Sequence, residues 1–204
     1  MLRVGLTGNI GSGKSTVGKF LKECGFYLFD ADSIIKSFYE EKGEVYKKVV
    51  SVFGKEVLDS QGNIDRKKLA HIVFSDKEKL KVLEDITHSA LYERLEEEFK
   101  KLPPKSVAVV EATLIVEKGT MDKYHALVVV YAPYEVCKAR ALMAGYTDED
   151  FERRWKNQMP PEEKLRYGDF LIDNTKDIQS LKSRVNQICS VLKNWLDFSD
   201  GRTP

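Results

Sequence analysis

Short apolar runs alternate along this chain with longer segments of helical periodicity. The runs that predict strands cover residues 2–7, 26–30, 106–111, 126–132 and 170–173. Those after the first are nearly continuous, as expected of buried parallel strands. Helical spacing predicts helices over 14–24, 31–41, 44–53, 65–74, 76–101, 134–143, 148–157 and 177–197. This alternation predicts an α/β fold with a mainly parallel five-stranded sheet, covered on both faces.

Two segments interrupt the alternation. Between the second and third strands lies far more helix than a usual crossover needs, which predicts a helical insertion over about 31–104. The segment 144–168 carries many charges of both signs, and it fits either a solvated pair of helices or a mobile lid that brings arginines over a phosphate. The remaining parts, 1–30, 105–143 and 169–197, are expected to form the core of a single domain spanning 1–204, and the tail 199–204 is expected to fray.

Composition narrows the class of protein. The chain has 204 residues, of which 42% are hydrophobic and 32% charged, so it can bury a core of its own. A net charge of +1 argues against a large basic surface, and we expect no nucleic-acid partner. Because no apolar run approaches the ~18 residues of a membrane span and the chain begins at once with a strand, we expect a cytoplasmic protein without a membrane partner. The cysteines, Cys24, Cys137 and Cys189, are odd in number and far apart, which predicts reduced and mostly buried thiols.

The junction of the first strand and first helix carries a phosphate-binding motif. The segment GNIGSGKS at 8–15 fits GxxxxGK[ST] without a mismatch, directly after a strand. Its glycines permit positive φ and a close approach of the backbone to a ligand, and successive N–H groups at the helix N-terminus form an anion nest. A glycine-rich turn that binds nothing would have no use for the lysine and serine. The residues predicted to bind a nucleoside triphosphate are Gly8, Gly11, Ser12, Gly13, Lys14, Ser15 and Thr16, with Lys14 directed to the β and γ phosphates and Ser15 to Mg²⁺.

Because kinases, GTPases and motor proteins all contain such a loop, other motifs of the chain are needed to distinguish among these classes. The string NTKD at 174–177 resembles the base-reading NKxD of a GTPase, but no DxxG follows a strand near the middle of the chain. The second predicted strand ends in Asp30 and is followed at once by Asp32, at the carboxyl edge where open α/β sheets bind ligands. Two carboxylates beside a phosphate loop suit a small-molecule kinase, one accepting the proton of the attacking hydroxyl and the other holding Mg²⁺ or its waters. The alternative for this pair is that it only caps the following helix.

Taken together, these motifs resemble the dephospho-CoA kinase family over nearly the whole chain. The similar segments are LTGNIGSGKST at 6–16, FDADSI at 29–34, FGKEVLDSQGNIDRKKLAHIVFSD at 53–76, EATLIVEKG at 111–119 and QMPPEEKLRYGDFLIDN at 158–174. The chain departs from the family's pattern at Thr113, where proline is common, at Glu111, which replaces a shorter acidic residue, and at Ser89, which follows the histidine in place of proline. In 144–146, AGY lacks an arginine often found there.

The resemblance implies a three-layer P-loop kinase with a helical acceptor-binding insertion and a lid. It implies transfer of phosphate from ATP, with Mg²⁺, to the ribose 3′-hydroxyl of dephospho-CoA, giving CoA and ADP, the last step of coenzyme A synthesis. It also implies residue roles. Asp32 would be the catalytic base with Asp30 as the alternative. Lys14, Arg140 and one of Arg154 or Lys164 would stabilise the transferred phosphoryl group. Asn174 would lie near adenine. Asp30 would contact the acceptor, which Arg66, Lys67, His88 and the aromatic residues around Phe74 would hold.

Several alternatives stay open at this level. Arg140 could be a solvated helix charge, His88 could be structural, and either Glu111 or Glu117 could touch the metal. The nearest rival activity is that of another small-molecule P-loop kinase, acting on a nucleoside monophosphate or a metabolite hydroxyl. A nucleotide-dependent switch that phosphorylates no acceptor is the rival from another class. ATP and dephospho-CoA are the expected partners, and a monomer is favoured.

Overall fold

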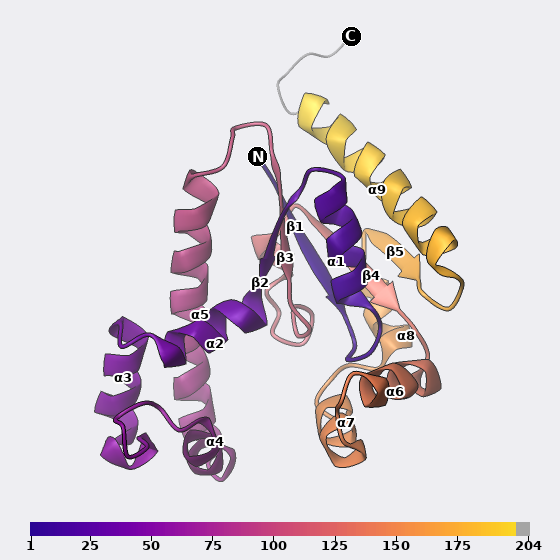
Figure 1. Cartoon of the computed structure of the whole chain (residues 1–204). Helices are drawn as coiled ribbons and strands as arrows, with labels where there is room; N and C mark the ends of the chain where they lie inside the picture. The colour runs from indigo at the N-terminus through magenta and orange to yellow at the C-terminus, as the bar shows by residue number, and fades with distance from the viewer. Residues whose placement is uncertain (199–204) are drawn as a thin grey trace. The chain divides into compact units, whose positions relative to one another are not determined.

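The computed structural model describes residues 1–198, in which five strands form one parallel sheet. The strands are β1 (Leu2–Gly8), β2 (Tyr27–Asp30), β3 (Val107–Glu111), β4 (Ala126–Tyr131) and β5 (Phe170–Asp173). Their order across the sheet is β2-β3-β1-β4-β5, so the first strand of the chain is the central one (Figure 1). The predicted α/β class and all five predicted strands are confirmed. The expectation for the tail at 199–204 lies outside the described residues.

The described chain divides into two compact units. The first, residues 1–30 and 103 onward, contains the sheet. The second, Ala31–Leu102, is helical. The sheet unit also contains α1 (Lys14–Glu23), α6 (Tyr134–Met143), α7 (Asp148–Trp155), α8 (Pro161–Lys164) and α9 (Ile178–Phe198), with short 3-10 turns η2 (Met121–Lys123) and η3 (Leu165–Tyr167).

Alternation of side chains along the strands builds the core of the sheet unit. On one face, Val128 and Ile172 pack with Leu21 of α1 and Val185 of α9, and all four side chains are completely buried. On the other face, the alternate residue Val129 packs with Ile115, from the connection between β3 and β4. Because β3 and β4 lie inside the sheet, they are apolar at almost every position, as their sequence predicted.

The segment 144–168 is packed rather than merely solvated. Phe151 of α7 is completely buried against α6, where its ring and that of Trp155 surround Tyr134 with centroid distances of 5.1–5.6 Å. Lys138 of α6 adds ion pairs to Asp148 at 2.8 Å and to Glu152 at 2.9 Å. The anchoring of α7 on α6 therefore limits which part of this segment can move.

The helical unit consists of α2 (Ala31–Glu40), α3 (Glu44–Phe53), η1 (Lys55–Val57), α4 (Arg66–Phe74) and α5 (Lys77–Lys100). The long helix α5 contacts each of the other three helices, and its Leu91 and Leu95 are buried. Side-chain caps fix the starts of α4 and α5: Asp65 accepts from Lys67 N at 2.9 Å, and Asp76 accepts from Glu78 N at 2.9 Å.

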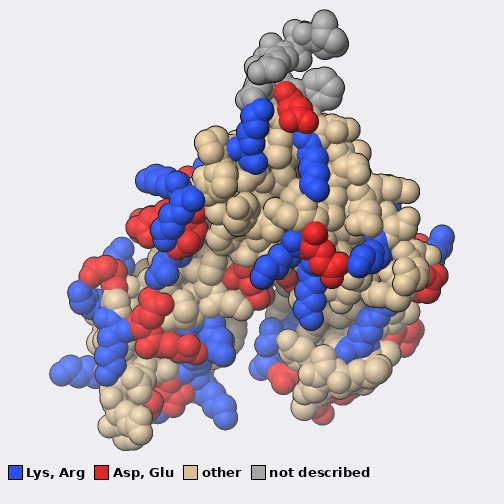
Figure 2. Space-filling view, turned by 45° about the horizontal axis from the view of Figure 1, so that its top comes forward, with Lys and Arg blue, Asp and Glu red and all other residues tan. Residues whose placement is uncertain are grey.

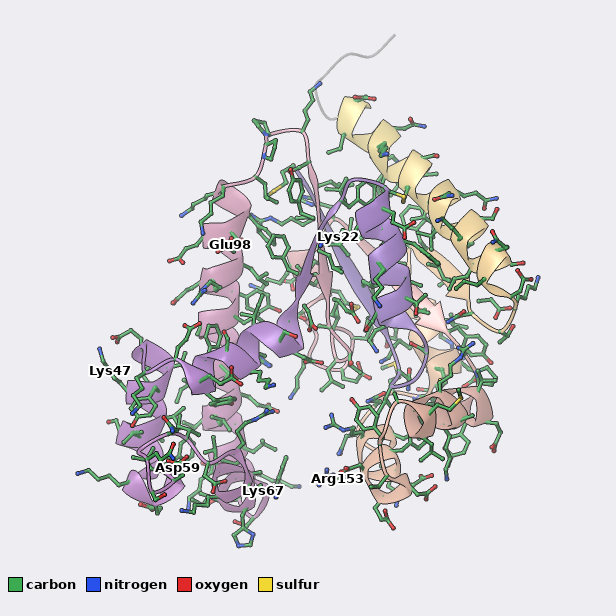
Figure 3. All side chains as sticks on the ribbon, viewed as in Figure 1. Lys22, Lys47, Asp59, Lys67, Glu98 and Arg153 are labelled. Atoms are coloured by element: carbon green, nitrogen blue, oxygen red, sulfur yellow. A yellow bond between two sulfur atoms is a disulfide. The ribbon has the colours of Figure 1, made fainter. Side chains whose placement is uncertain are left out.

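The connection between η1 and α4 is held by one carboxylate. Asp59, labelled in Figure 3, accepts hydrogen bonds from the backbone N–H groups of Gln61 at 2.8 Å and Asn63 at 2.9 Å. The bond from Asn63 is the main reason that the pKa of Asp59 lies below its usual value. Leu58 and Ile64 then pair as an isolated antiparallel bridge, two residues before α4 begins at Arg66.

Two expectations about burial and thiols are wrong. The run at 26–30 was expected to be a buried strand, but β2 lies at the edge of the sheet and leaves Tyr27 40% exposed. The cysteines were expected to be reduced, whereas the structure joins Cys24 and Cys189 in a disulfide and leaves only Cys137 as a buried thiol among the described residues. The disulfide arises because α1 and α9 pack together, a contact between residues 165 apart that sequence spacing could not reveal.

Charges of both signs mix on the surface. On the face drawn in Figure 2, Lys and Arg are interspersed with Asp and Glu, in line with the near-neutral net charge. No helix within residues 1–198 combines the length and apolar character that a membrane crossing requires.

Candidate active site

The phosphate-binding loop lies between β1 and α1, at the carboxyl edge of the sheet (Figure 1). Gly13 caps α1 with a φ of 96°, and Gly11 has a φ of 77°, both in the left-handed region that glycine favours. Space also demands glycine here. A Cβ on Gly11 would overlap the backbone carbonyl of Cys137 in α6, and a Cβ on Gly13 would overlap the amide of Asn174. The glycines thus serve the packing of the loop as well as its approach to phosphate.

The two chemical side chains of the motif begin α1. Lys14 Nζ donates to the carbonyl of Asn9 at 3.2 Å, which folds the lysine over its own loop. The hydroxyl of Ser15 donates to Glu111 Oε1 at 2.8 Å. Glu111 is the last residue of β3 and is only 8% exposed. A serine hydroxyl and a carboxylate are oxygen ligands of the kind that Mg²⁺ takes beside nucleotide phosphates, so the donors at this position fit that ion.

The two candidate aspartates belong to different units. Asp30 ends β2 and lies in register with Glu111 on β3, so the sheet brings these two carboxylate residues to the same edge. Asp32 lies in the first turn of α2 and is exposed. The sequence therefore identified one carboxylate of the sheet edge, Asp30, while Glu111 entered only as one of two candidates for the metal.

Asn174 supports the loop from the side. Its side chain is almost fully buried and donates from Nδ2 to the carbonyl of Ser12 at 2.8 Å. Arg140 of α6 donates in turn to the carbonyl of Asn174 at 2.9 Å, and its NH1 is buried without a hydrogen-bond partner among the described residues. Arg140 is thus tied to the loop through Asn174 rather than lying free on a helix. Contact of Asn174 with adenine stays a prediction.

The string NTKD is used for local structure. Asp177 accepts from the backbone N–H of Ser180 at 2.9 Å and from its hydroxyl at 2.8 Å, at the start of α9. These bonds lower the pKa of Asp177. Thr175 is held by Asp173, which accepts from its backbone N–H at 3.0 Å. The resemblance of this string to a base-reading loop is therefore explained by helix capping and by the contact of Asn174 with the phosphate loop.

Of the further residues proposed for the phosphoryl group, Lys164 is buried and Arg154 is exposed. The Lys164 side chain is 0% exposed, with Nζ 2.7 Å from Glu117 Oε1 and 3.1 Å from the carbonyl of Thr113. Burial lowers the pKa of Lys164, and the attraction of Glu117 opposes that effect. This position argues against a direct contact of Lys164 with phosphate. The Arg154 guanidinium lies 5.3 Å from the ring centroid of Tyr146. The preceding residue, Arg153, which is labelled in Figure 3, forms an ion pair with Asp150.

Apart from Asp30 at the end of β2, the residues predicted to bind the acceptor lie in the helical unit. Arg66 and Lys67 begin α4 and are exposed, and Phe74 at its end is 73% exposed. His88 is half-buried on α5. Burial raises the pKa of Tyr39 in α2, and the positive charge of Arg66 opposes that rise. The acceptor-binding roles of these residues stay predictions.

Sequence reasoning missed two residues that contact the loop. Gln158 Oε1 accepts from the backbone N–H of Ile10 at 2.9 Å, and the carbonyl of Met159 accepts from Asn9 Nδ2 at 3.0 Å. Gln158 and Met159 are the first two residues of the segment QMPPEEK, so the family resemblance marked the segment without revealing its purpose.

Comparison with known proteins gives a consistent result. The family model for dephospho-CoA kinase matches residues 2–180. A dephospho-CoA kinase from Aquifex aeolicus is 55% identical over 188 residues, which cover 92% of this chain and 96% of that protein. Among solved structures, TT1252 from Thermus thermophilus is 33% identical with a TM-score of 0.83, covering 94% of this chain and 97% of that one. A dephospho-CoA kinase from Campylobacter jejuni is 29% identical with a TM-score of 0.68, with the same coverage. This chain belongs to the dephospho-CoA kinase family.

Proposed function

We propose that this protein transfers the γ-phosphoryl group of ATP to the ribose 3′-hydroxyl of dephospho-CoA, giving CoA and ADP in the last step of coenzyme A synthesis. Family membership supports the acceptor. The observation that carries the nucleotide part is the phosphate loop at the N-terminus of α1, with Ser15 bonded to the carboxylate that ends β3.

Catalysis here rests on positioning and charge rather than on covalent chemistry. The N–H groups of the loop and the ammonium of Lys14 hold the β and γ phosphates. Ser15 and Glu111 would hold Mg²⁺, which when bound neutralises charge on the phosphate oxygens. Arg140, whose NH1 has no partner among the described residues, adds a donor for the charge of the phosphoryl group in transfer.

Asp32 accepts the proton of the attacking 3′-hydroxyl, with Asp30 as the alternative. The acceptor is held by the helical unit through Arg66, Lys67, His88 and the exposed ring of Phe74. The positive charges suit the phosphates of dephospho-CoA, and an exposed aromatic ring suits stacking or apolar contact.

Water must be excluded from the bound nucleotide, or ATP would be hydrolysed. We infer that the part of the segment 144–168 that precedes Gln158 closes over the nucleotide, with α7 moving together with α6, on which it stays packed. Limited proteolysis tests this closure. Cleavage within 144–168 should slow when an ATP analogue and dephospho-CoA are both present, and equal sensitivity with and without the ligands would contradict it.

We also infer that the enzyme works in the cytoplasm as a monomer, with ATP and dephospho-CoA as its partners and without nucleic acid or membrane. The interspersed charges and the small-molecule substrates of the proposed reaction support this inference. Light scattering behind size-exclusion chromatography should give the mass of one chain.

The decisive experiment is release of ADP from MgATP with and without dephospho-CoA, combined with the mass of the product. We expect ADP release that depends on dephospho-CoA and a product heavier by one phosphoryl group. The variant Lys14→Ala is the control, because it should lose turnover while the sheet stays folded. Tight ATP binding without stimulation by dephospho-CoA would assign a different acceptor, to be sought among nucleoside monophosphates and metabolite alcohols.

A further inference from the structure

A short segment, Gln158–Lys164, forms hydrogen bonds to two residues of the phosphate loop. We call Gln158–Lys164 the brace, because Gln158 and Met159 hold Ile10 and Asn9 through the two hydrogen bonds described above. These bonds join residues about 150 apart in sequence, so the conformation of the first half of the loop depends on where the brace lies.

The brace is itself held by one buried carboxylate. Glu117 Oε1 accepts from the backbone N–H of Met159 at 2.8 Å and pairs with Lys164 Nζ at 2.7 Å. Both ends of the brace therefore converge on the same oxygen. Glu117 Oε2 is buried and has no hydrogen-bond partner within residues 1–198, so this carboxylate depends on Met159 and Lys164 for its stabilisation.

Lys164 links the brace to the first strand as well. Its Nζ donates to the carbonyl of Thr113 at 3.1 Å, and the same carbonyl accepts from the hydroxyl of Thr7 at 3.0 Å. Thr7 directly precedes the glycine that opens the phosphate-binding motif. Three separate parts of the chain, at 7–10, 113–117 and 158–164, thus meet around one lysine that no solvent reaches.

A buried ion pair of this kind specifies geometry. Removing one partner leaves an uncompensated charge in the interior, whereas replacing both by apolar groups of similar size is often tolerated. Without Lys164, Glu117 must move or take up a proton. Either change weakens the acceptor of Met159 N and releases Gln158 and the Met159 carbonyl from the loop.

We propose that Lys164 and Glu117 are positioning residues for ATP: their ion pair holds Gln158 and Met159 where they fix Ile10 and Asn9 in the conformation that binds phosphate. The pair touches neither substrate nor metal and acts only through the brace. The reaction of the family does not need to be known for this test, because binding of MgATP can be measured directly.

The first experiment measures the Kd for MgATP by calorimetry, well below the melting temperature, in Lys164→Met and Glu117→Gln. We expect Kd to rise about tenfold in each, the equivalent of ~1.4 kcal/mol, with the KM for dephospho-CoA changed less than twofold. Val185→Ala is the control, because this side chain is buried in the contact of α9 with the core and touches no part of the brace. It should lower the melting temperature and leave Kd unchanged.

The double variant Lys164→Met with Glu117→Leu separates positioning from stability. An apolar pair should restore much of the melting temperature lost in the single variants. It cannot supply an acceptor for Met159 N, so the Kd for MgATP should stay raised. Recovery of both quantities together would overturn the proposal, since it would reduce the pair to a stabilising contact.

Gln158→Ala keeps the proposal testable if the buried variants fold poorly, because this side chain is only half-buried. We expect its effect on Kd and that of Lys164→Met to be less than additive, because both act on the same contact with Ile10. A Kd within twofold of the parent in Gln158→Ala, or full additivity of the two changes, would also overturn the proposal. Failure of acceptor phosphorylation would leave these binding results unaffected.

Discussion

Ser15 and Glu111 lie 96 residues apart in the sequence, and the hydroxyl of the first donates to the carboxylate of the second at 2.8 Å. This bond places one negative charge beside the helix N-terminus where the phosphates of ATP and their cation are expected. Of the two glutamates considered for the metal, the geometry favours Glu111, because Glu117 is committed to the brace.

Glu111→Gln should therefore lower turnover about 10²-fold and raise the Mg²⁺ concentration needed for half-maximal activity. The amide can still accept from Ser15, so the loss reflects charge rather than packing. The measurement is a Mg²⁺ titration of activity at saturating ATP. Glu163→Gln, an exposed change on α8, is the matched control. An unchanged Mg²⁺ requirement in Glu111→Gln would remove this residue from the metal site.

Asp32→Asn should reduce turnover by about 10²-fold or more while ATP still binds, because the amide cannot accept the hydroxyl proton. Asp30→Asn is measured beside it, since Asp30 is the alternative base and lies in register with Glu111. Calorimetry with MgATP shows whether binding survives in each variant. Full turnover in Asp32→Asn, with a large loss in Asp30→Asn, would exchange the two roles.

Asn174→Ala should raise the KM for ATP about tenfold with a smaller change in turnover. It leaves the buried carbonyl of Ser12 without its donor, at a cost of about 1–3 kcal/mol, and frees the loop beside Gly13. Lys176→Ala, at an exposed position in the same turn, should leave both constants unchanged. The ratio of ATP to GTP use is measured at the same time. Loss of that preference, without a change in KM for ATP, would mean that Asn174 reads the base instead.

Cys24→Ser and Cys189→Ser should each lower thermal stability by the same amount. The disulfide closes a loop of 165 residues, and disulfides typically stabilise a folded protein by roughly 2–4 kcal/mol. For a protein of this size that corresponds to a fall of about 5–15 °C in melting temperature. Wild-type protein melted with a thiol reductant should match the variants, and the variants should not respond to reductant. A wild-type melting curve that is insensitive to reductant under denaturing conditions would show that the bond is not formed.

Cys137 should weaken the folded state at alkaline pH. Burial raises the pKa of its thiol from 9.0 to about 11, against the opposing positive charge of Arg140. Because the pKa of this thiol is higher in the folded than in the unfolded state, the neutral thiol contributes its full share to the free energy of unfolding below about pH 9. That share is lost as the pH rises toward 11. The free energy of unfolding of wild type, minus that of Cys137→Ala, should fall by up to ~1.4 kcal/mol per pH unit in this window. Urea unfolding at pH 8, 9.5 and 10.5 measures the difference, and a constant value would contradict the expectation.

Local patterns predicted the fold and the loop well. Apolar runs located β3 and β4 within a residue, because both lie inside a sheet and need apolar side chains on two faces. The spacing of Gly8, Gly13 and Lys14 predicted the phosphate loop, because the chemistry of the nest demands those residues in that order. The edge position of β2 was not foreseen, since Tyr27 and its neighbours are as apolar as a central strand.

What the sequence could not reveal depends on contacts between distant segments. The pairing of Cys24 with Cys189 and of Lys164 with Glu117 follows from how α9 and the brace fold back, and neither has a local signal. Lys164 was one of two residues, with Arg154 as the other, that the family resemblance implied for the transferred phosphoryl group. Only the completed fold shows that its charge is satisfied inside the protein.

The order of strands across the sheet has a consequence for synthesis on the ribosome. The central strand β1 emerges from the ribosome before the other strands. Its two neighbours in the sheet, β3 and β4, begin only at residues 107 and 126. The nascent chain therefore carries the finished nucleotide motif beside an unpaired apolar strand while all of Ala31–Leu102 is being made. The helical unit, with contacts of its own, is in a position to fold during that interval. Protection of β1 from aggregation then depends on how quickly translation reaches β3.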